Sequence, residues 1–171
     1  MQKIILIGFM GSGKTSIAKK ISEYLDITFI DTDAYIEENQ NQSINEIFTN
    51  NGEEFFRALE TKILEEIIKE KNSGVIATGG GLPIRDENQK LLKGIGKIVY
   101  LRTKAETIYQ RIKDDNSRPL LNTPDPRQKI HDLLNERTPI YEKTADVVVD
   151  TDNKSVGQIV DEILFDLKLI S

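Results

Sequence analysis

Residues 8–15 read Gly-Phe-Met-Gly-Ser-Gly-Lys-Thr, which matches the pattern Gly-x-x-x-x-Gly-Lys-[Ser/Thr]. The apolar run 4–7 comes directly before this stretch, and a helical pattern of apolar residues follows it at Ile17, Ala18, Ile21 and Leu25. A strand, a glycine-rich turn and a helix in this order form a loop whose backbone N–H groups face an anion. The stretch therefore predicts a nucleoside triphosphate site; the alternative is a glycine-rich turn that matches by chance.

The last two residues of this loop have separate expected tasks. Lys14 would reach the β- and γ-phosphates as a point charge, and the hydroxyl of Thr15 would bind Mg²⁺. The sequence thus predicts Mg²⁺ as the cofactor that accompanies the nucleotide.

Length and composition limit the class of protein. The 171 residues suit a single domain, 1–171, with one core, and the absence of cysteine fits a reducing, cytoplasmic setting. A formal net charge of −5 argues against nucleic-acid binding. No apolar run is long enough for a membrane span, and the first residues lack a signal-peptide pattern. We expect a soluble, cytoplasmic monomer that binds neither nucleic acid nor membrane.

Five short apolar runs predict five strands, and stretches of mostly helical pattern, too long for hairpins, separate them. Strands joined in this way pair in parallel through right-handed crossovers. We therefore expect an α/β fold with a five-stranded parallel sheet flanked by helices. The predicted strands are residues 4–7, 28–30, 75–77, 97–101 and 145–149.

Two capping boxes and one amphipathic pattern mark helices. Residues 43–46 and 103–106 begin with Ser or Thr and end with Glu, which predicts helices that open at 44 and after the fourth strand. Apolar residues from 55 to 68 recur at helical spacing and predict a long helix that ends near Gly74.

The segment 114–126 is polar and contains three prolines, which predicts a loop. We interpret it as part of a lid, about residues 112–126, that closes over the nucleotide. Arg118 precedes a proline there and has no helix face to solvate, so a lid arginine that reaches phosphate explains it best. Arg111 is a secondary phosphate candidate.

Asp31 and Asp33 follow the second predicted strand, at the sheet edge where α/β folds bind ligands. Residues two apart in a strand point to the same side, so both carboxylates would face the γ-phosphate. One would hold Mg²⁺ through water while the other accepts a proton from an incoming hydroxyl. The alternative for Asp33 is a helix N-cap.

Three consecutive glycines, Gly79, Gly80 and Gly81, follow the third predicted strand. Such a run is costly unless the backbone must approach another group closely or adopt positive φ. We interpret the run as a place where a ligand meets bare backbone; a plain strand-to-helix turn is the alternative.

Two further arginines are candidates for anion binding. Arg57 lies near the start of the long predicted helix, and its alternative surface partners are Glu53, Glu54 and Glu60. Arg137 precedes a proline at a predicted helix end, where it would otherwise favour the helix C-terminus. We interpret Tyr141 as a packing aromatic.

Six motifs in sequence order resemble the shikimate kinase family over nearly the whole chain. They are the phosphate-binding loop, Asp31-x-Asp33, Phe56-Arg57-x-x-Glu60, Gly79-Gly80-Gly81, Arg118-Pro119-Leu120-Leu121 and Arg137-x-Pro139-x-Tyr141. The resemblance implies a P-loop fold like that of nucleoside monophosphate kinases. It also implies transfer of the ATP γ-phosphoryl group to the 3-hydroxyl of shikimate, a step toward chorismate and the aromatic amino acids.

The resemblance also implies roles for individual residues. The family's ATP-phosphate positions correspond to Gly11, Ser12, Gly13, Lys14, Thr15 and Ser16. Thr15 would bind Mg²⁺, and Asp31 would help to bind Mg²⁺ through water. The shikimate positions fall on Asp33, Arg57, Gly79 and Arg137, with a substrate-binding helical region at about 33–61. Arg118 falls on the lid arginine that reaches ATP. Lys154 stands where the family often has an arginine near adenine. The expected catalytic residues are Lys14, Arg118 and Asp33.

Two rival functions share the phosphate-binding loop. A gluconate, adenylylsulfate or nucleoside monophosphate kinase would differ in its acceptor residues. A regulatory GTPase or a non-catalytic nucleotide-binding module is the second rival. No Asp-x-x-Gly follows a predicted strand, and residues 103–106 are the nearest approach to Asn-Lys-x-Asp, which argues against the GTPase.

Overall fold

The computed structural model describes residues 3–115 and 122–170 and forms a five-stranded parallel sheet in the order β2-β3-β1-β4-β5. The predicted sheet and its flanking helices are therefore confirmed. The strands are β1 Lys3–Ile7, β2 Thr28–Asp31, β3 Gly74–Ala77, β4 Gly96–Arg102 and β5 Val147–Asp150.

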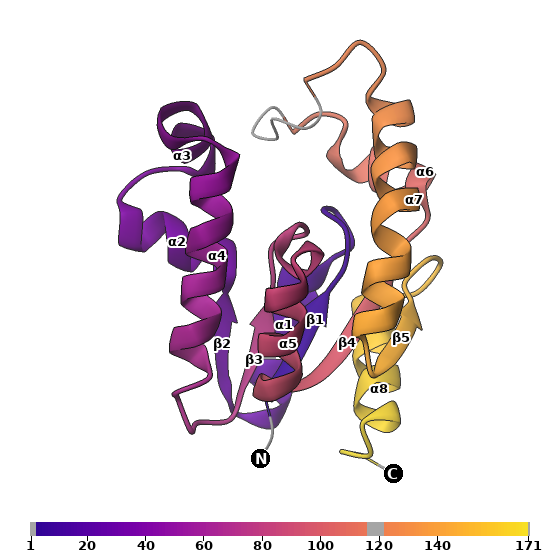
Figure 1. Cartoon of the computed structure of the whole chain (residues 1–171). Helices are drawn as coiled ribbons and strands as arrows, with labels where there is room; N and C mark the ends of the chain where they lie inside the picture. Colours follow the sequence, from indigo (N-terminus) through magenta and orange to yellow (C-terminus); the bar gives the residue numbers. More distant parts are fainter. Residues whose placement is uncertain (1–2, 116–121, 171) are drawn as a thin grey trace.

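Helices connect successive strands and form layers on both sheet faces. They are α1 Lys14–Leu25, α2 Thr32–Gln40, α3 Ile44–Asn51, α4 Glu53–Ile67, α5 Asp86–Ile95, α6 Ala105–Ile112, α7 Pro126–Thr144 and α8 Val156–Asp166, with a 3₁₀ turn at Leu82–Ile84. Figure 1 shows α2, α3 and α4 together beside β2, and α6, α7 and α8 on the side of β4 and β5.

The central strand β1 is buried on both faces because helices cover each of them. Ile5 and Ile7 pack with apolar residues of α4, α5 and α7, whereas Ile4 and Leu6 pack with those of α1 and α8. Alternate residues of a strand point to opposite faces, so a continuous apolar run fits this central position. A third cluster, Ile36, Ile47 and Phe56, joins α2, α3 and α4.

Several predicted helix boundaries need correction. The capping box at residues 43–46 is present at the start of α3, but the one predicted at 103–106 is not. α6 begins at Ala105, and its N-cap Lys104 has no side-chain acceptor that could cap the helix. The hydroxyl of Thr103 pairs with that of Thr151 at 2.5 Å. The helix predicted to end near Gly74 ends at Ile67.

Two further corrections concern residues of the candidate site. The chain turns from β2 into α2 after Asp31, so Asp33 lies in the first turn of a helix and not on a strand. Pro139 does not end its helix: α7 continues to Thr144, with buried Tyr141 and Thr144 holding the segment beyond the proline. Within the described residues, no helix is both long enough and apolar enough to cross a bilayer.

Candidate active site

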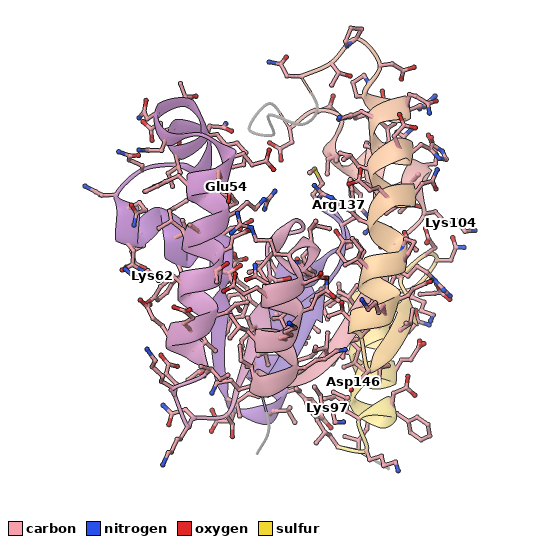
Figure 2. The ribbon with its side chains drawn as sticks, viewed as in Figure 1. Glu54, Lys62, Lys97, Lys104, Arg137 and Asp146 are labelled. Carbon is pink, nitrogen blue, oxygen red and sulfur yellow. The ribbon has the colours of Figure 1, made fainter. Side chains whose placement is uncertain are left out.

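The candidate site lies at the edge where the parallel strands end. Figure 2 places Glu54 and Arg137 toward this end of the molecule, and Lys97 and Asp146 near the opposite end of the sheet. The loops after β1, β2 and β3 meet here, because parallel strands deliver their carboxyl ends to the same edge.

The loop after β1 adopts the backbone of an anion-binding turn. Gly8, Gly11 and Gly13 have φ values of 149°, 74° and 92°, which side chains with a Cβ rarely adopt. Gly13 is the N-cap of α1 and has no side chain that could accept a hydrogen bond from the helix. The main-chain N–H groups in the first turn of α1 therefore point outward without a capping side chain. The predicted nucleotide-binding residues from Gly11 to Ser16 all lie in this loop and the first turn of α1.

The Lys14 side chain lies back over its own loop. Its Nζ donates to the carbonyl oxygens of Gly8 and Phe9, each at 2.8 Å. These contacts hold the ammonium group at the centre of the loop, beside the cavity of about 220 Å³ that Asp31 and Asp33 also line.

Thr15 and Asp31 form the pair predicted for a metal. The Thr15 hydroxyl donates to Asp31 Oδ2 at 2.7 Å, so a hydroxyl and a carboxylate meet beside the phosphate-binding loop. The other oxygen of Asp31 accepts from the backbone N–H groups of Asp33 and Ala34 and caps α2. The capping role considered for Asp33 was therefore wrong and belongs to Asp31.

Asp33 projects from the first turn of α2 toward Gly79. Its Oδ1 is sealed from solvent and has no hydrogen-bond partner. Burial, followed by the charge of Asp31, raises the pKa of the Asp33 carboxyl to about 6, although Lys14 and Arg57 act in the opposite direction. An unpaired buried carboxylate is costly, which makes this residue a functional candidate.

The three glycines let other groups approach the backbone closely, and none of them has a positive φ. A Cβ on Gly79 would lie 2.5 Å from Asp33 Oδ1 and 3.0 Å from Glu60 Oε1. A Cβ on Gly81 would collide with the guanidinium group of Arg57. The segment is therefore more than a plain turn, because charged side chains lie directly against its bare backbone.

Arg57 forms ion pairs within its own helix and also lines a cavity. Its guanidinium group donates to Glu60 at 2.7 Å and to Glu53 at 3.2 Å, whereas Glu54 pairs with Arg85. Glu60 is fully buried, and burial raises its pKa to about 7 although Arg57 lowers it. Of the three glutamates considered as surface partners of Arg57, Glu53 and Glu60 do pair with it, but Glu60 is buried and not on the surface.

Arg137 and Tyr141 lie one turn apart on α7 and are both buried. The Arg137 guanidinium group lies 5.6 Å from the centre of the Phe9 ring. Residue 137 stands in the middle part of α7 and not in its last turn. The Tyr141 hydroxyl donates to the Gly80 carbonyl at 2.6 Å, and its ring packs on Tyr100. Tyr141 packs as expected and also ties α7 to the three glycines.

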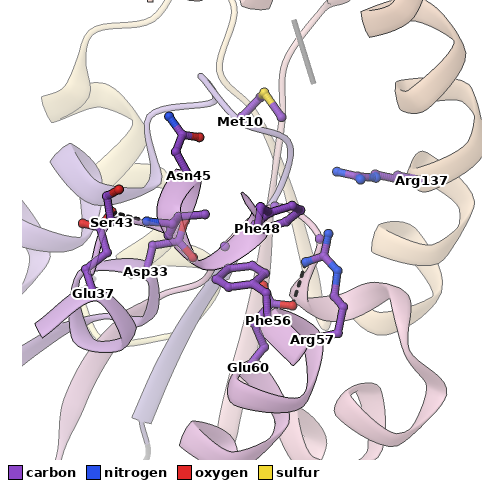
Figure 3. A pocket seen from close by; sticks show the side chains of 14 residues that line it. Met10, Asp33, Glu37, Ser43, Asn45, Phe48, Phe56, Arg57, Glu60 and Arg137 are labelled. Carbon is purple, nitrogen blue, oxygen red and sulfur yellow. Dashed lines mark hydrogen bonds and ion pairs between the residues drawn. The ribbon is translucent and has the colours of Figure 1, made fainter. Parts of the chain in front are cut away.

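Asp33, Arg57 and Arg137 line one cavity of about 310 Å³, which we call the acceptor pocket. Figure 3 shows Arg137 entering from the side opposite Asp33, with Arg57 and Glu60 joined beneath the pocket. The pocket shares Met10, Asp33 and Gly80 with the cavity at the phosphate-binding loop. It is lined by Met10, Asp33, Glu37, Ser43, Ile44, Asn45, Phe48, Phe56, Arg57, Glu60, Gly79, Gly80, Gly81 and Arg137.

Several of these lining residues had no predicted binding role. Phe48 and Phe56, whose ring centres lie 5.0 Å apart, form an apolar wall. The periodicity of their helices predicts apolar faces, but not which faces cover a pocket.

A third cavity of about 380 Å³ lies on the other side of the phosphate-binding loop. Gly11, Ser16, Arg111 and Lys154 are among its lining residues, and Arg111 Nη1 donates to the Gly11 carbonyl at 2.9 Å. Lys154, the adenine candidate, pairs with Glu162 at 2.5 Å. Arg118 and much of the predicted lid lie outside the described residues.

Comparisons with known proteins identify the family of this chain. A family model described as shikimate kinase matches residues 10–168. The chain belongs to the shikimate kinase family. A shikimate kinase of Thermodesulfovibrio yellowstonii is 41% identical over 171 residues, which cover 100% of this chain and 98% of the relative. One of Caldicellulosiruptor bescii is 47% identical over 152 residues, with coverage of 89% and 87%.

Solved structures give the same family. The shikimate kinase of Acinetobacter baumannii in complex with shikimate has a TM-score of 0.94 and 37% identity, covering 99% of this chain and 94% of that chain. A gluconokinase of Sinorhizobium meliloti has a TM-score of 0.59 and 17% identity, covering 98% and 92%, which shows the fold alone. The P-loop fold is thus confirmed, and the acceptor distinguishes the shikimate kinase family from such neighbours.

The buried Asp33 carboxylate predicts a stability cost that depends on pH. Because its folded pKa of about 6 lies above the ordinary value of 3.8, stability is lost as pH rises through this range. Asp33→Asn should therefore unfold at higher denaturant concentration than the wild type at pH 8. The gain should shrink by about 1 kcal/mol at pH 5, measured by urea denaturation.

Asp161→Asn on the exposed side of α8 is the matched control, since it removes the same charge without burial. A gain for Asp33→Asn that is equal at both pH values would contradict the burial cost.

Proposed function

We propose that the chain transfers the γ-phosphoryl group of ATP to the 3-hydroxyl of shikimate and releases shikimate 3-phosphate and ADP. The observation that carries this proposal is the junction of two cavities. The acceptor pocket is lined by two arginines and three acidic residues, and it shares Met10, Asp33 and Gly80 with the cavity at the phosphate-binding loop.

Recognition of shikimate is assigned to the two arginines and the bare backbone. Arg57 and Arg137 enter the pocket from α4 and α7, and guanidinium forks bind carboxylates through paired hydrogen bonds. Gly79, Gly80 and Gly81 provide backbone groups at the pocket floor. The complex of the Acinetobacter baumannii relative with shikimate supports this choice of acceptor.

Asp33 is assigned to the acceptor hydroxyl, because its carboxyl borders both cavities. The hydroxyl oxygen attacks the γ-phosphorus, its proton passes to the Asp33 carboxylate, and the bridging oxygen leaves with ADP. Phosphoryl transfer asks a protein mainly to position the reactants and neutralise charge.

On the nucleotide side, residues 11–16 bind the phosphates and Lys14 turns from its loop carbonyls to the β- and γ-phosphates. The donor set of Thr15 and Asp31 fits Mg²⁺, which prefers oxygen ligands and takes most of them from water and phosphate. Mg²⁺ supplies charge neutralisation when bound. Arg118 as lid arginine and Lys154 as adenine contact complete the assignment.

The monomeric state and cytoplasmic location expected from the sequence stay predictions. A single elution volume matching 19.4 kDa in size-exclusion chromatography would support the monomer.

Acceptor preference is the direct test of the function. In an ADP-release assay with MgATP, shikimate should be phosphorylated far faster than gluconate or AMP, because only shikimate offers a carboxylated ring of the proposed shape. Turnover of gluconate or AMP at a comparable rate would contradict the assignment.

Asp33→Asn tests the proton acceptor. The amide cannot take the proton, so kcat should fall by about 10²- to 10⁴-fold while ADP affinity, measured by calorimetry, stays near that of the wild type. In the wild type, kcat/KM for shikimate should fall as pH drops below about 6, where Asp33 becomes protonated. Near-normal kcat in the variant would remove this role.

Arg137→Ala tests carboxylate recognition. Loss of a charge-assisted bond present in both the ground and transition states should raise the KM for shikimate by about tenfold or more and leave the KM for ATP unchanged. Arg127→Ala is the matched control on the same helix, because Arg127 is exposed and stacks on Tyr109. A variant that changes only the ATP parameters would place the carboxylate site elsewhere.

A further inference from the structure

α6 begins without a cap of its own, and a distant aspartate replaces it. Asp152 Oδ2 accepts from the backbone N–H of Lys104, the N-cap residue, at 2.9 Å. Asp152 Oδ1 accepts from the hydroxyl of Thr107, the third residue of the helix. These are the two positions that a local capping box would join, and a carboxylate there also complements the helix dipole.

Asp152 belongs to the loop between β5 and α8, which lines one side of the third cavity, that of about 380 Å³. The neighbouring Thr151 donates its backbone N–H to the Arg102 carbonyl at 2.9 Å and pairs its hydroxyl with Thr103. Thr151 and Lys154 line the cavity together with residues of the phosphate-binding loop and Arg111. Hydrogen bonds thus join the loop that would face adenine to the start of α6.

The other end of α6 is fastened to the phosphate-binding loop. Arg111 donates to the Gly11 carbonyl at 2.9 Å. A Cβ on Gly11 would lie 2.7 Å from Ile112 Cγ2, so the helix packs directly on that glycine. α6 therefore bridges the two walls of the cavity, held at one wall by Asp152 and at the other by Arg111 and Ile112.

We propose that Asp152 is a positioning residue for the nucleotide. It acts through α6: by holding the helix start to the loop 151–155, it sets the distance between this loop and the phosphate-binding loop and keeps Arg111 on Gly11. This inference rests on the proposed kinase function and concerns its nucleotide side only. The acceptor pocket contains no residue of α6 or of the loop 151–155.

The test separates nucleotide binding from acceptor binding. Asp152→Ala should weaken ADP binding in calorimetry and raise the KM for ATP, each by about fivefold or more, because the loss of a helix cap lets α6 shift. The KM for shikimate should stay within about twofold of the wild type, since the acceptor pocket is unaffected. Asp152→Asn keeps the shape with one fewer acceptor and should give an intermediate loss, which also covers the case in which the alanine variant fails to fold.

Asp150→Asn, two residues before Asp152, is the matched control. Asp150 is exposed, pairs with Arg102 and makes no hydrogen bond to α6, so ADP affinity should stay unchanged. Thr107→Val should weaken ADP binding in the wild type but add little in the Asp152→Ala background, as expected for partners in one interaction.

Two results would overturn the proposal. One is wild-type ADP affinity in folded Asp152 variants, even with a lowered melting temperature, since Asp152 would then be only a structural cap. The other is an equal rise in the KM for ATP and for shikimate. ADP calorimetry needs no acceptor, so a wild type that does not phosphorylate shikimate would contradict the proposed function without affecting this test.

Discussion

The close approach of charged side chains to the bare backbone of Gly79, Gly80 and Gly81 is the constraint on which the acceptor pocket depends. Asp33 and Glu60 reach the first of these glycines and Arg57 covers the last. A Cβ on Gly79 would force the Asp33 carboxylate to shift and would press against Glu60 Oε1. The middle carbonyl is held by Tyr141, which fixes the glycines relative to α7 and Arg137. Three segments far apart in the sequence, α2, α4 and α7, thereby contact one short stretch of main chain.

This arrangement lowers the stability of the fold. Asp33 and Glu60 each bury an oxygen without a hydrogen-bond partner, and burial raises the pKa of both carboxyls. A folded protein tolerates such groups where a bound partner satisfies them. The buried charges of the pocket lower the free energy of unfolding but hold charged groups in fixed positions. Phosphoryl transfer depends mainly on positioning and electrostatic stabilisation, so such an arrangement suits it.

The local patterns predicted the strands, the phosphate-binding loop and the capping box of α3, because each depends on residues close in the sequence. Contacts over long separations were not predictable in the same way. Asp152 caps a helix 48 residues earlier, and this contact invalidates the capping box expected at 103–106. Likewise, α7 continues through Pro139 because its far end is packed in the core. Candidate site residues were found by type and motif, but the burial of Glu60 and the wall of Phe48 and Phe56 required the fold.

The most direct test of this account is shikimate binding by Gly79→Ala, measured by titration calorimetry with the nucleotide site filled by ADP. Gly157→Ala is the control, because a Cβ there meets nothing closer than 3.9 Å. The account predicts that folded Gly79→Ala binds shikimate more than about tenfold more weakly, a loss of about 1.4 kcal/mol, with ADP affinity retained. Wild-type shikimate affinity in this variant would contradict the claim that bare backbone at Gly79 builds the acceptor site.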